Sequence, residues 1–393
     1  MSLQDNHEVE LLLNIVRGEL DNRGEDALDG VDGVDWNQLV ALAIEHDVGG
    51  LLCSAFRRTP AGCIPEEIYQ AADAHLNYHR QQNTRSLELL RELGELLESA
   101  GVSIIPFKGP MLSRRLYDDL ALRSFKDLDF LVPDDQIQVT LDCLNARGYQ
   151  EDIPPLSPAQ LAHYRYYNGQ AILFGDSLPI EPHWSIVPRV LMIRLDHESL
   201  WERSENTAIG TWPTRQLAVE DMLIALCIHG GKELWGTLKW IVDIAVLLRR
   251  NHDLKWEELH RRSRAWGTLR MVLLGLTLAQ RFFDAPLPKQ VRQWIDDDAS
   301  VDALARYVAE LLFAHDKSSH PAKYTLNGYN LRLRDTNLDR LRFAIATTFV
   351  PRNGYFQPYK IPDRLFALYY LIKPLHDVAL LPLWKLQKRI RGS

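Results

Sequence analysis

The run of residues 126–132, KDLDFLV, constrains the fold more than any other feature of the chain. It carries two carboxylates two residues apart in an apolar segment that ends before Pro133. The run predicts a β-strand, in which residues i and i+2 lie on one face, about 6.5–7 Å apart. Asp127 and Asp129 would then share a face. The opposite face would point into a core and consists of Leu128, Phe130 and Val132.

Two neighbouring carboxylates are costly to bury unless a cation compensates them. Hard oxygen ligands favour Mg²⁺, with Mn²⁺ as the alternative, and two ions about 3.5–4 Å apart would fit such a pair. The other interpretation is a solvent-facing strand end, where the aspartates pair with Lys126 or Arg123. The pattern by itself leaves both interpretations open.

A third acid favours the metal interpretation. Glu181 lies in the segment PIEPHW, residues 179–184, where it would share a strand face with His183. If this strand pairs beside residues 127–132, Glu181 meets both aspartates. Three clustered acids predict a metal-supported catalytic site in which one carboxylate orients or deprotonates a nucleophile.

The dipeptide Lys108-Gly109 follows a short β-branched run, residues 102–107, and precedes an expected helix over residues 110–122. A strand, a glycine turn and a helix N-terminus together offer free backbone N–H groups to a phosphate. Lys108 would add a positive charge on the phosphate oxygens. An ordinary strand-to-helix turn is the simpler alternative.

The remaining pattern puts this core between two helical regions. Helical spacing covers much of residues 8–99, and a strand pair is expected at residues 171–174 and 180–186. Further helices are expected at residues 218–229, 234–250, 256–283, 291–314 and 338–350. We therefore expect an α+β fold in three parts: an N-terminal helical region at 1–100, an α/β core at 101–190 and a C-terminal helical domain at 191–393.

These motifs together resemble the nucleotidyltransferase fold of the polymerase β superfamily, a mixed β-sheet core with flanking helices. More narrowly, the chain is similar to the uncharacterised bacterial nucleotidyltransferase family over about residues 35–374. The motifs that carry the likeness are Phe107-Lys108-Gly109, Tyr117, Arg123, residues 126–132, Gly148-Tyr149, residues 181–184, residues 226–229 and residues 238–243. Two positions depart from the wider superfamily: Lys108-Gly109 stands where Gly-Ser or Gly-Gly is usual, and Glu181 stands where Asp is common.

The resemblance implies an enzyme that transfers a nucleoside monophosphate from an NTP, with ATP favoured, to an acceptor and releases pyrophosphate. The acceptor is left open between a metabolite, a sugar and a peptide. Asp127, Asp129 and Glu181 are expected to be the catalytic and metal-binding residues. The nucleotide is expected to contact Lys108, Gly109, Arg123, Lys126, Lys239 and Asp243, and the acceptor His183 and His229.

Each of these assignments has a plainer alternative. Lys239 and Asp243 are spaced four residues apart and would form an ordinary ion pair on a helix surface. His183 and His229 would serve as structural histidines, and Arg123 and Lys126 as plain surface charges. Tyr117 is expected to be a packing residue.

Composition narrows the setting and the partners. The net charge of −7 argues against broad nucleic-acid binding, and no apolar run approaches the roughly 18 residues of a membrane span. Four cysteines without metal-ligand spacing, and an N-terminus without a secretory signal pattern, favour a cytoplasmic location. The apolar C-terminal stretch with its basic tail suggests a helix that packs on the helical domain, with a membrane-surface helix as the alternative.

Two other functions compete with an active transferase. The chain would also suit a catalytically inactive scaffold that binds nucleotide, although a scaffold has no need for three clustered acids. A toxin-type transferase that modifies tRNA is the other alternative, but the chain shows no clear basic, aromatic-rich stripe.

Overall fold

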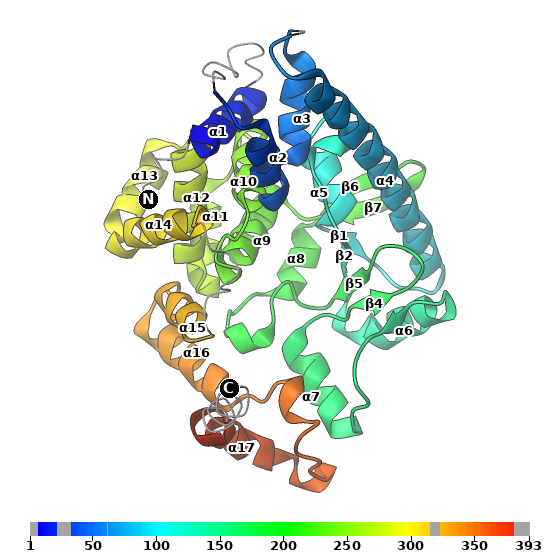
Figure 1. The fold of residues 1–393 in the computed structure, drawn as a ribbon. Coiled ribbons are helices and arrows are strands. Elements are labelled where there is room, and N and C mark those ends of the chain that lie inside the picture. Colours follow the sequence, from blue (N-terminus) through cyan, green and yellow to red (C-terminus); the bar gives the residue numbers. More distant parts are fainter. Residues whose placement is uncertain (1–6, 22–32, 61, 315–322, 381–393) are drawn as a thin grey trace, which may run out of the picture.

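The computed structural model describes residues 7–21, 33–60, 62–314 and 323–380. Helices occupy both ends of this part of the chain, and a small β-sheet lies between them (Figure 1). The first four helices are α1 (His7–Leu20), α2 (Trp36–Glu45), α3 (Gly49–Arg58) and α4 (Glu66–Ser99). The 34-residue α4 is the long helix along one edge of the molecule in Figure 1. Its expected end after Ser99 is confirmed, because Gly101 takes a left-handed conformation with φ +78°.

The main sheet has five strands in the order β1-β2-β5-β4-β3. Only β2 and β5 pair in parallel, and the other three pairs are antiparallel. The strands are β1 (Ile105–Pro106), β2 (Leu128–Leu131), β3 (Gln150–Glu151), β4 (Leu173–Phe174) and β5 (Ile180–His183). The predicted α+β class with a mixed sheet is confirmed.

One face of the sheet is closed by an apolar cluster, as the alternation in residues 126–132 predicts. Leu128, Phe130 and Val132 are all buried in this cluster. They pack with leucines near the end of α4 and with Leu141 and Leu144 of α6 (Ile137–Ala146). Because Asp129 alternates with these residues, its side chain is left to the other face of the sheet.

Helices α9 to α14 form the body that follows the sheet. They are α9 (Val219–Lys232), α10 (Leu238–Arg250), α11 (Trp256–Trp266), α12 (Leu269–Phe283), α13 (Lys289–Asp297) and α14 (Ala299–Leu312). A second apolar cluster runs continuously from α1–α3 into these helices, so the two helical regions share a core. The three-part division of the chain stays a prediction.

Several expected elements end earlier or divide. The helix that begins at Lys108-Gly109 is α5 (Gly109–Leu116), and a separate 3₁₀ turn, η3 (Leu120–Leu122), follows it. The single helix expected over 256–283 is two helices, because Gly267 adopts φ +73° and caps α11. The expected helix at 291–314 likewise divides into α13 and α14 at Asp298, which caps the second.

Several elements were not expected from the sequence, among them one helix, one hairpin and one short strand, of which the first two have local signals. Helix α7 (Pro158–Asn168) begins with a capping box between Ser157 and Gln160 and has a proline in its first turn. The hairpin of β6 (Glu205–Ile209) and β7 (Trp212–Gln216) turns at Gly210, which has φ +58°. The third is β3, which is two residues long.

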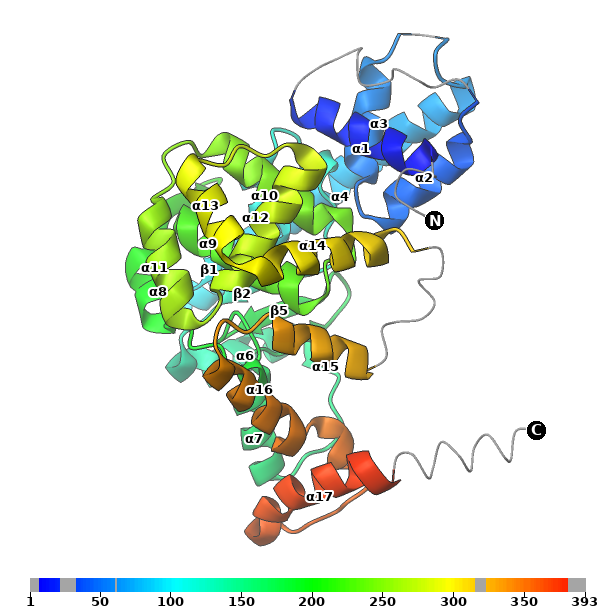
Figure 2. The ribbon, with the colours of Figure 1, turned by 90° about the vertical axis from the view of Figure 1, so that its left-hand side faces the viewer.

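The chain ends, within its described part, in α15 (Lys323–Arg332), α16 (Asn337–Phe349) and α17 (Tyr369–Leu375). Figure 2 shows α17 at the end of the molecule far from the body of α9–α14, with α15 and α16 between them. The remaining short elements are η4 (Asp134–Gln136), η5 (Arg189–Leu191), α8 (His197–Arg203), η6 (Asn353–Tyr355), η7 (Asp363–Leu368) and η8 (His376–Leu380). Among the described helices, none has the length and apolarity to cross a bilayer.

Candidate metal and nucleotide site

The parallel pairing of β2 and β5 brings the third acid beside the first two. Asp129 lies opposite Glu181 in the register, and Leu131 lies opposite His183. Since side chains two residues apart share a strand face, Asp129, Glu181 and His183 all project from one side of the sheet. One oxygen of each acid and one ring nitrogen of His183 lie within 4.8 Å of one another. Glu181 is thus within reach of a shared ion, and its role as a ligand stays a prediction.

Hydrogen bonds orient this cluster. His183 donates from Nε2 to Oδ1 of the buried Asp129, over 2.8 Å. Gln170 donates from its side-chain amide to Oε2 of Glu181, over 2.7 Å. Burial lowers the pKa of His183, although Asp129 opposes the shift. A neutral imidazole that donates from Nε2 orients Asp129 and keeps its lone pair on Nδ1, so Nε2 is not available to an ion while this bond is present.

The electrostatics of the three acids differ. Burial raises the pKa of Asp127 to about 6, with the charge of Asp129 adding to the shift. Burial, followed by the charges of Asp129 and Asp127, raises the pKa of Glu181 to about 7. Burial acts on Asp129 too, but Lys108 and His183 hold the pKa of Asp129 well below its usual range. The site therefore concentrates more negative charge than its own cation, Lys108, compensates.

This donor set fits a hard divalent cation. Carboxylate oxygens are the ligands that Mg²⁺ prefers in proteins. A bound cation would lower the raised pKa values of Asp127 and Glu181, because it stabilises the charged form of each carboxylate. Asp127 lies just before β2 and is half-buried. Its carboxyl is outside the group of atoms within 4.8 Å, which contains His183 instead.

The turn at Lys108-Gly109 is specified by the backbone. Gly109 has φ +55°, and a Cβ there would lie 2.9 Å from the carbonyl oxygen of Asp127. Both the conformation and the close approach require glycine. The turn thereby holds the start of α5 against the beginning of β2. Lys108 extends over the site, with Nζ 3.6 Å from Oδ1 of Asp129 and 5.1 Å from the ring centroid of Phe107.

Arg123 and Asp243 meet each other in the interior. Arg123 donates from Nε to Oδ1 of Asp243 over 2.9 Å and from Nη2 to Oδ2 over 2.9 Å. The hydroxyl of Tyr117 donates to the same carboxylate over 3.1 Å. Nη1 of Arg123 is one of the buried atoms that lack a partner in the described part of the chain. Asp243 thus joins α10 to the core. If this pair contacts a nucleotide, Arg123 would make the contact, because its Nη1 is the group that remains without a partner among the described residues.

Lys239 also has a partner distant in the sequence. Its Nζ donates to Oδ2 of Asp47, between α2 and α3, over 2.9 Å. The alternative of a surface ion pair between Lys239 and Asp243 is wrong, because each residue pairs with a different partner and Asp243 is fully buried. Lys126, in contrast, is exposed. The nucleotide contacts expected for these residues stay predictions.

His229 faces the site from α9. Burial lowers the pKa of His229 well below its usual value, and the charge of Lys108 lowers it further. Its ring packs edge-on against Trp240, with centroids 5.1 Å apart.

Gln170, which binds Glu181, was not anticipated, because the sequence around it contains no signal of a strand-flanking ligand.

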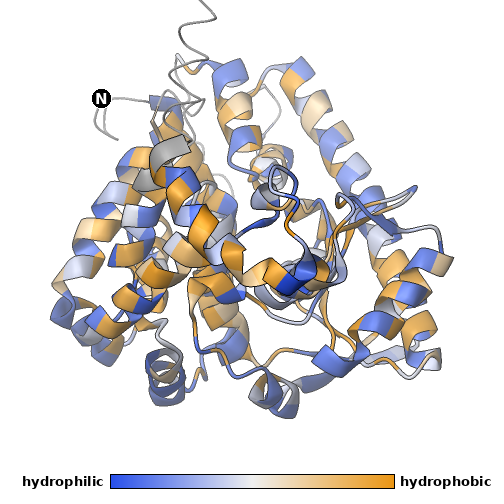
Figure 3. Ribbon diagram, turned by 90° about the horizontal axis from the view of Figure 1, so that it is seen from below, coloured by the Kyte–Doolittle hydropathy of each residue, from blue (hydrophilic) through white to orange (hydrophobic). Residues whose placement is uncertain are grey.

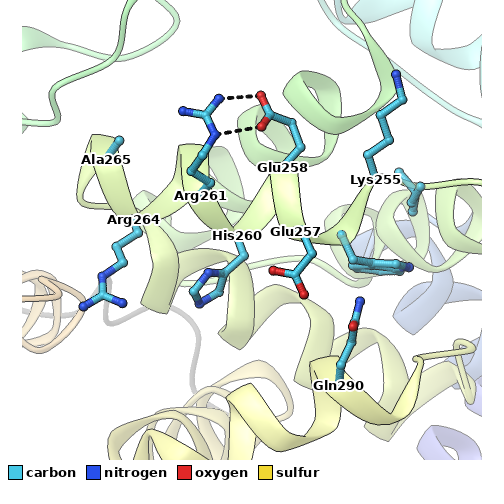
Figure 4. Close-up of a pocket in the computed structure, with 10 residues that line it drawn as sticks. Lys255, Glu257, Glu258, His260, Arg261, Arg264, Ala265 and Gln290 are labelled. Carbon is cyan, nitrogen blue, oxygen red and sulfur yellow. Dashed lines mark hydrogen bonds and ion pairs between the residues drawn. The ribbon is translucent and has the colours of Figure 1, made fainter.

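Two hollows differ in their relation to the acids. One of about 900 Å³ is lined by residues of α11, by Leu254 and Lys255 just before it and by Gln290. Figure 4 shows Glu258 and Arg261 of this hollow paired with each other. No residue of the main sheet lines it. The other, of about 450 Å³, is lined by residues of α7, η5, α9, α15 and α16 and by residues 350–354. None of the three acids of the site lines it, but its Asn168 donates from the side-chain amide to the carbonyl of Gln170, the residue that bonds Glu181, over 2.9 Å.

A sheet of this topology, with acids on adjacent parallel strands and a glycine turn beside them, is the arrangement expected for a nucleotidyltransferase. A family model described as uncharacterised nucleotidyltransferase matches residues 32–284. The match covers more than half of the chain and includes every expected site residue, so the chain belongs to the uncharacterised nucleotidyltransferase family. It ends well before residue 374, so the last 90 residues of the proposed likeness rest on the sequence resemblance alone. No curated protein matches the chain.

Proposed function

We propose that the protein transfers a nucleoside monophosphate from an NTP, with ATP favoured, to a small-molecule or peptide acceptor. The observation that supports the proposal most is the pairing of Asp129 with Glu181 across β2 and β5, with Lys108 3.6 Å from Asp129. Membership of a nucleotidyltransferase family supports the reaction class.

In the proposed reaction, an acceptor oxygen bonds to the α-phosphorus while the bond from that phosphorus to the bridging β-oxygen breaks. The acceptor proton passes to the Glu181 carboxylate, and pyrophosphate leaves with the bonding electrons. Lys108 would hold phosphate oxygens at the start of α5. Mg²⁺ or Mn²⁺ held by Asp127, Asp129 and Glu181 would neutralise triphosphate charge.

We propose further that the acceptor reaches Glu181 from the 450 Å³ cavity. What supports this is a hydrogen-bonded link from the cavity wall to the acid, since Asn168 donates to the carbonyl of Gln170 and the side-chain amide of Gln170 donates to Glu181. Two of its charged lining residues, Lys232 and Glu233, pair with each other. Arg352 also lines the cavity and carries a positive charge. Together with Tyr164, Tyr167, Asn168, Asn327 and Asn330 it suits a polar molecule that bears hydroxyl groups.

The experiment is incubation of the protein with each α-³²P-labelled NTP, Mg²⁺ and fractionated acceptor pools. The proposal expects label in a new product and an equal amount of pyrophosphate. Metal-dependent NTP binding without turnover in any pool would favour the inactive scaffold, and label that appears only in RNA would favour the tRNA-modifying alternative.

A further inference from the structure

Exposed apolar side chains gather at the C-terminal end of the described chain. Of 17 large hydrophobic residues that are exposed in the described part, nine lie between residues 338 and 378. We call these nine the C-terminal apolar face: Leu338, Leu341, Ile345, Phe349, Leu365, Leu368, Leu371, Leu375 and Val378. Figure 3 looks at this end of the molecule and shows hydrophobic residues along the helices nearest the viewer. A cluster of this kind on a folded protein marks an interaction surface.

The spacing of these residues makes two continuous stripes. On α16 they recur at intervals of three and four residues, which puts them on one side of a helix. The opposite side of α16 is buried through Phe343, Ala346 and Val350. The second stripe runs along η7, α17 and η8 with the same intervals. The packing of α16 therefore uses one apolar side, and within the described residues a second one is left exposed.

The polar residues at the C-terminal end of α17 and just after it face the protein, and the apolar residues face outward. Lys373 is buried and donates to the carbonyls of Thr347 and Thr348, at the end of α16, over 2.5 and 3.0 Å. His376 is bonded to the hydroxyl of Tyr359 over 2.8 Å. These contacts fix the rotation of α17, so Leu371 and Leu375, 60% and 65% exposed, point outward.

Charge is also distributed unevenly along the chain, with an excess of positive charge at the C-terminal end. Residues 337–393 contain ten lysines and arginines and three aspartates, a net charge of +7. The whole chain carries −7, so residues 1–336 carry −14. The segment after the described part, residues 381–393, holds four of these basic residues and no acid: Lys385, Lys388, Arg389 and Arg391.

We propose that the C-terminal apolar face docks on the surface of an anionic lipid bilayer. Aliphatic side chains flanked by lysine and arginine are the composition that inserts into the headgroup region of such a bilayer. A second copy of the chain fits this face less well, because a symmetric contact would bring two +7 segments together. A nucleic acid would be met by Leu, Ile and Val where stacking aromatic residues are needed.

The test is co-sedimentation of the full chain with vesicles of phosphatidylcholine alone and of phosphatidylcholine mixed with phosphatidylglycerol. The wild-type protein is expected to bind the anionic vesicles, and to bind them less at high salt because the Debye length shortens. The double variant Leu371→Gln/Leu375→Gln is expected to lower the partition coefficient at least about tenfold. The matched control is Ile44→Gln, which removes a side chain of similar exposure, 59%, on α2 and should bind like the wild type.

Circular dichroism and the thermal midpoint establish that the variants are folded, as expected for changes at exposed positions. Equal vesicle binding by the double variant and the wild type would overturn the proposal, and so would equal binding to both vesicle types. A wild-type dimer in sedimentation velocity that Leu371→Gln/Leu375→Gln dissociates, without vesicle binding, would assign the face to a second copy instead.

Discussion

Glu181 lies directly opposite Asp129 in the parallel pairing of β5 and β2, and an oxygen of each lies within 4.8 Å of the other. Two acids 52 positions apart in the sequence are thus held on one face by adjacent strands. The pairing accounts for the raised pKa of Glu181, about 7, because burial and the charge of Asp129 both oppose its ionisation. A bound cation would reverse this effect.

The double variant Asp127→Asn/Asp129→Asn is expected to lose Mg²⁺-dependent NTP binding, since amide groups replace the charged ligands. Titration calorimetry with Mg²⁺ and a non-hydrolysable NTP measures this loss. Asp135→Asn is the matched control, because Asp135 is exposed and lies on η4, after β2. Metal-dependent binding that survives in Asp127→Asn/Asp129→Asn would contradict the metal assignment.

The stability of the metal-free protein is expected to fall as the pH rises from about 4 to about 7. Asp127 and Glu181 have folded-state pKa values of about 6 and 7, above the ordinary carboxyl values of 3.8 and 4.5. The folded state therefore binds protons that the unfolded state has already lost, and this stabilisation disappears as the pH passes the folded-state values. Asp129, with a lowered pKa, acts in the opposite direction only at lower pH.

Thermal unfolding across this pH range, with and without Mg²⁺, measures the effect. The midpoint shift caused by Mg²⁺ should grow as the pH rises, because protons compete with the ion for the same oxygens. Glu181→Gln should flatten part of the pH dependence. A Mg²⁺ shift that is independent of pH would show that the ion binds elsewhere.

Lys108→Ala is expected to weaken binding of a triphosphate more than binding of the monophosphate, because Lys108 would contact the outer phosphates. Gly109→Ala should instead destabilise the fold, by about 1–3 kcal/mol, since it forces a side chain into a left-handed conformation. Nucleotide titrations and denaturant unfolding separate the two effects. Equal losses of triphosphate and monophosphate affinity in Lys108→Ala would argue against a phosphate contact.

Asp243→Ala is expected to cost about 3–5 kcal/mol of stability, because it leaves the buried charge of Arg123 without a partner. The double variant Arg123→Met/Asp243→Leu should recover part of this loss, since it removes both charges. Denaturant unfolding measures both. If Asp243→Ala unfolds like the wild type, the pair does not hold α10 to the core.

The local part of the site was predictable, and so was the strand pairing that brings Glu181 beside Asp129, but the distant ion pairs were not. The alternation in residues 126–132 predicts which of its residues join the core, and the structure agrees. Gly109, after Lys108, also predicts the turn, since a Cβ at this position would meet the backbone of Asp127. The ion pairs of Arg123 with Asp243 and of Lys239 with Asp47 join residues 120 and 192 positions apart, and no local spacing encodes them.

Helix α7 was missed for a different reason. The capping box of Ser157 and Gln160 marks the start of the helix. The helical periodicity of its apolar residues is weak, however, because aromatic and polar residues alternate along it. The position of Gln170 beside Glu181 follows from where α7 ends. Contacts of this kind depend on how whole elements pack, and the sequence pattern carries little information about that.

The most direct test of the proposed reaction compares the wild-type protein with Glu181→Gln in the transfer of label from an α-³²P-NTP, with Mg²⁺ and an acceptor pool. The wild type should form labelled product and pyrophosphate in equal amounts. Glu181→Gln should stay folded and bind NTP, but its transfer rate should fall by about 10²–10⁴, as for loss of a positioned base. Equal transfer by both proteins, or no labelled product from the wild type with any NTP and any acceptor pool, would contradict the account.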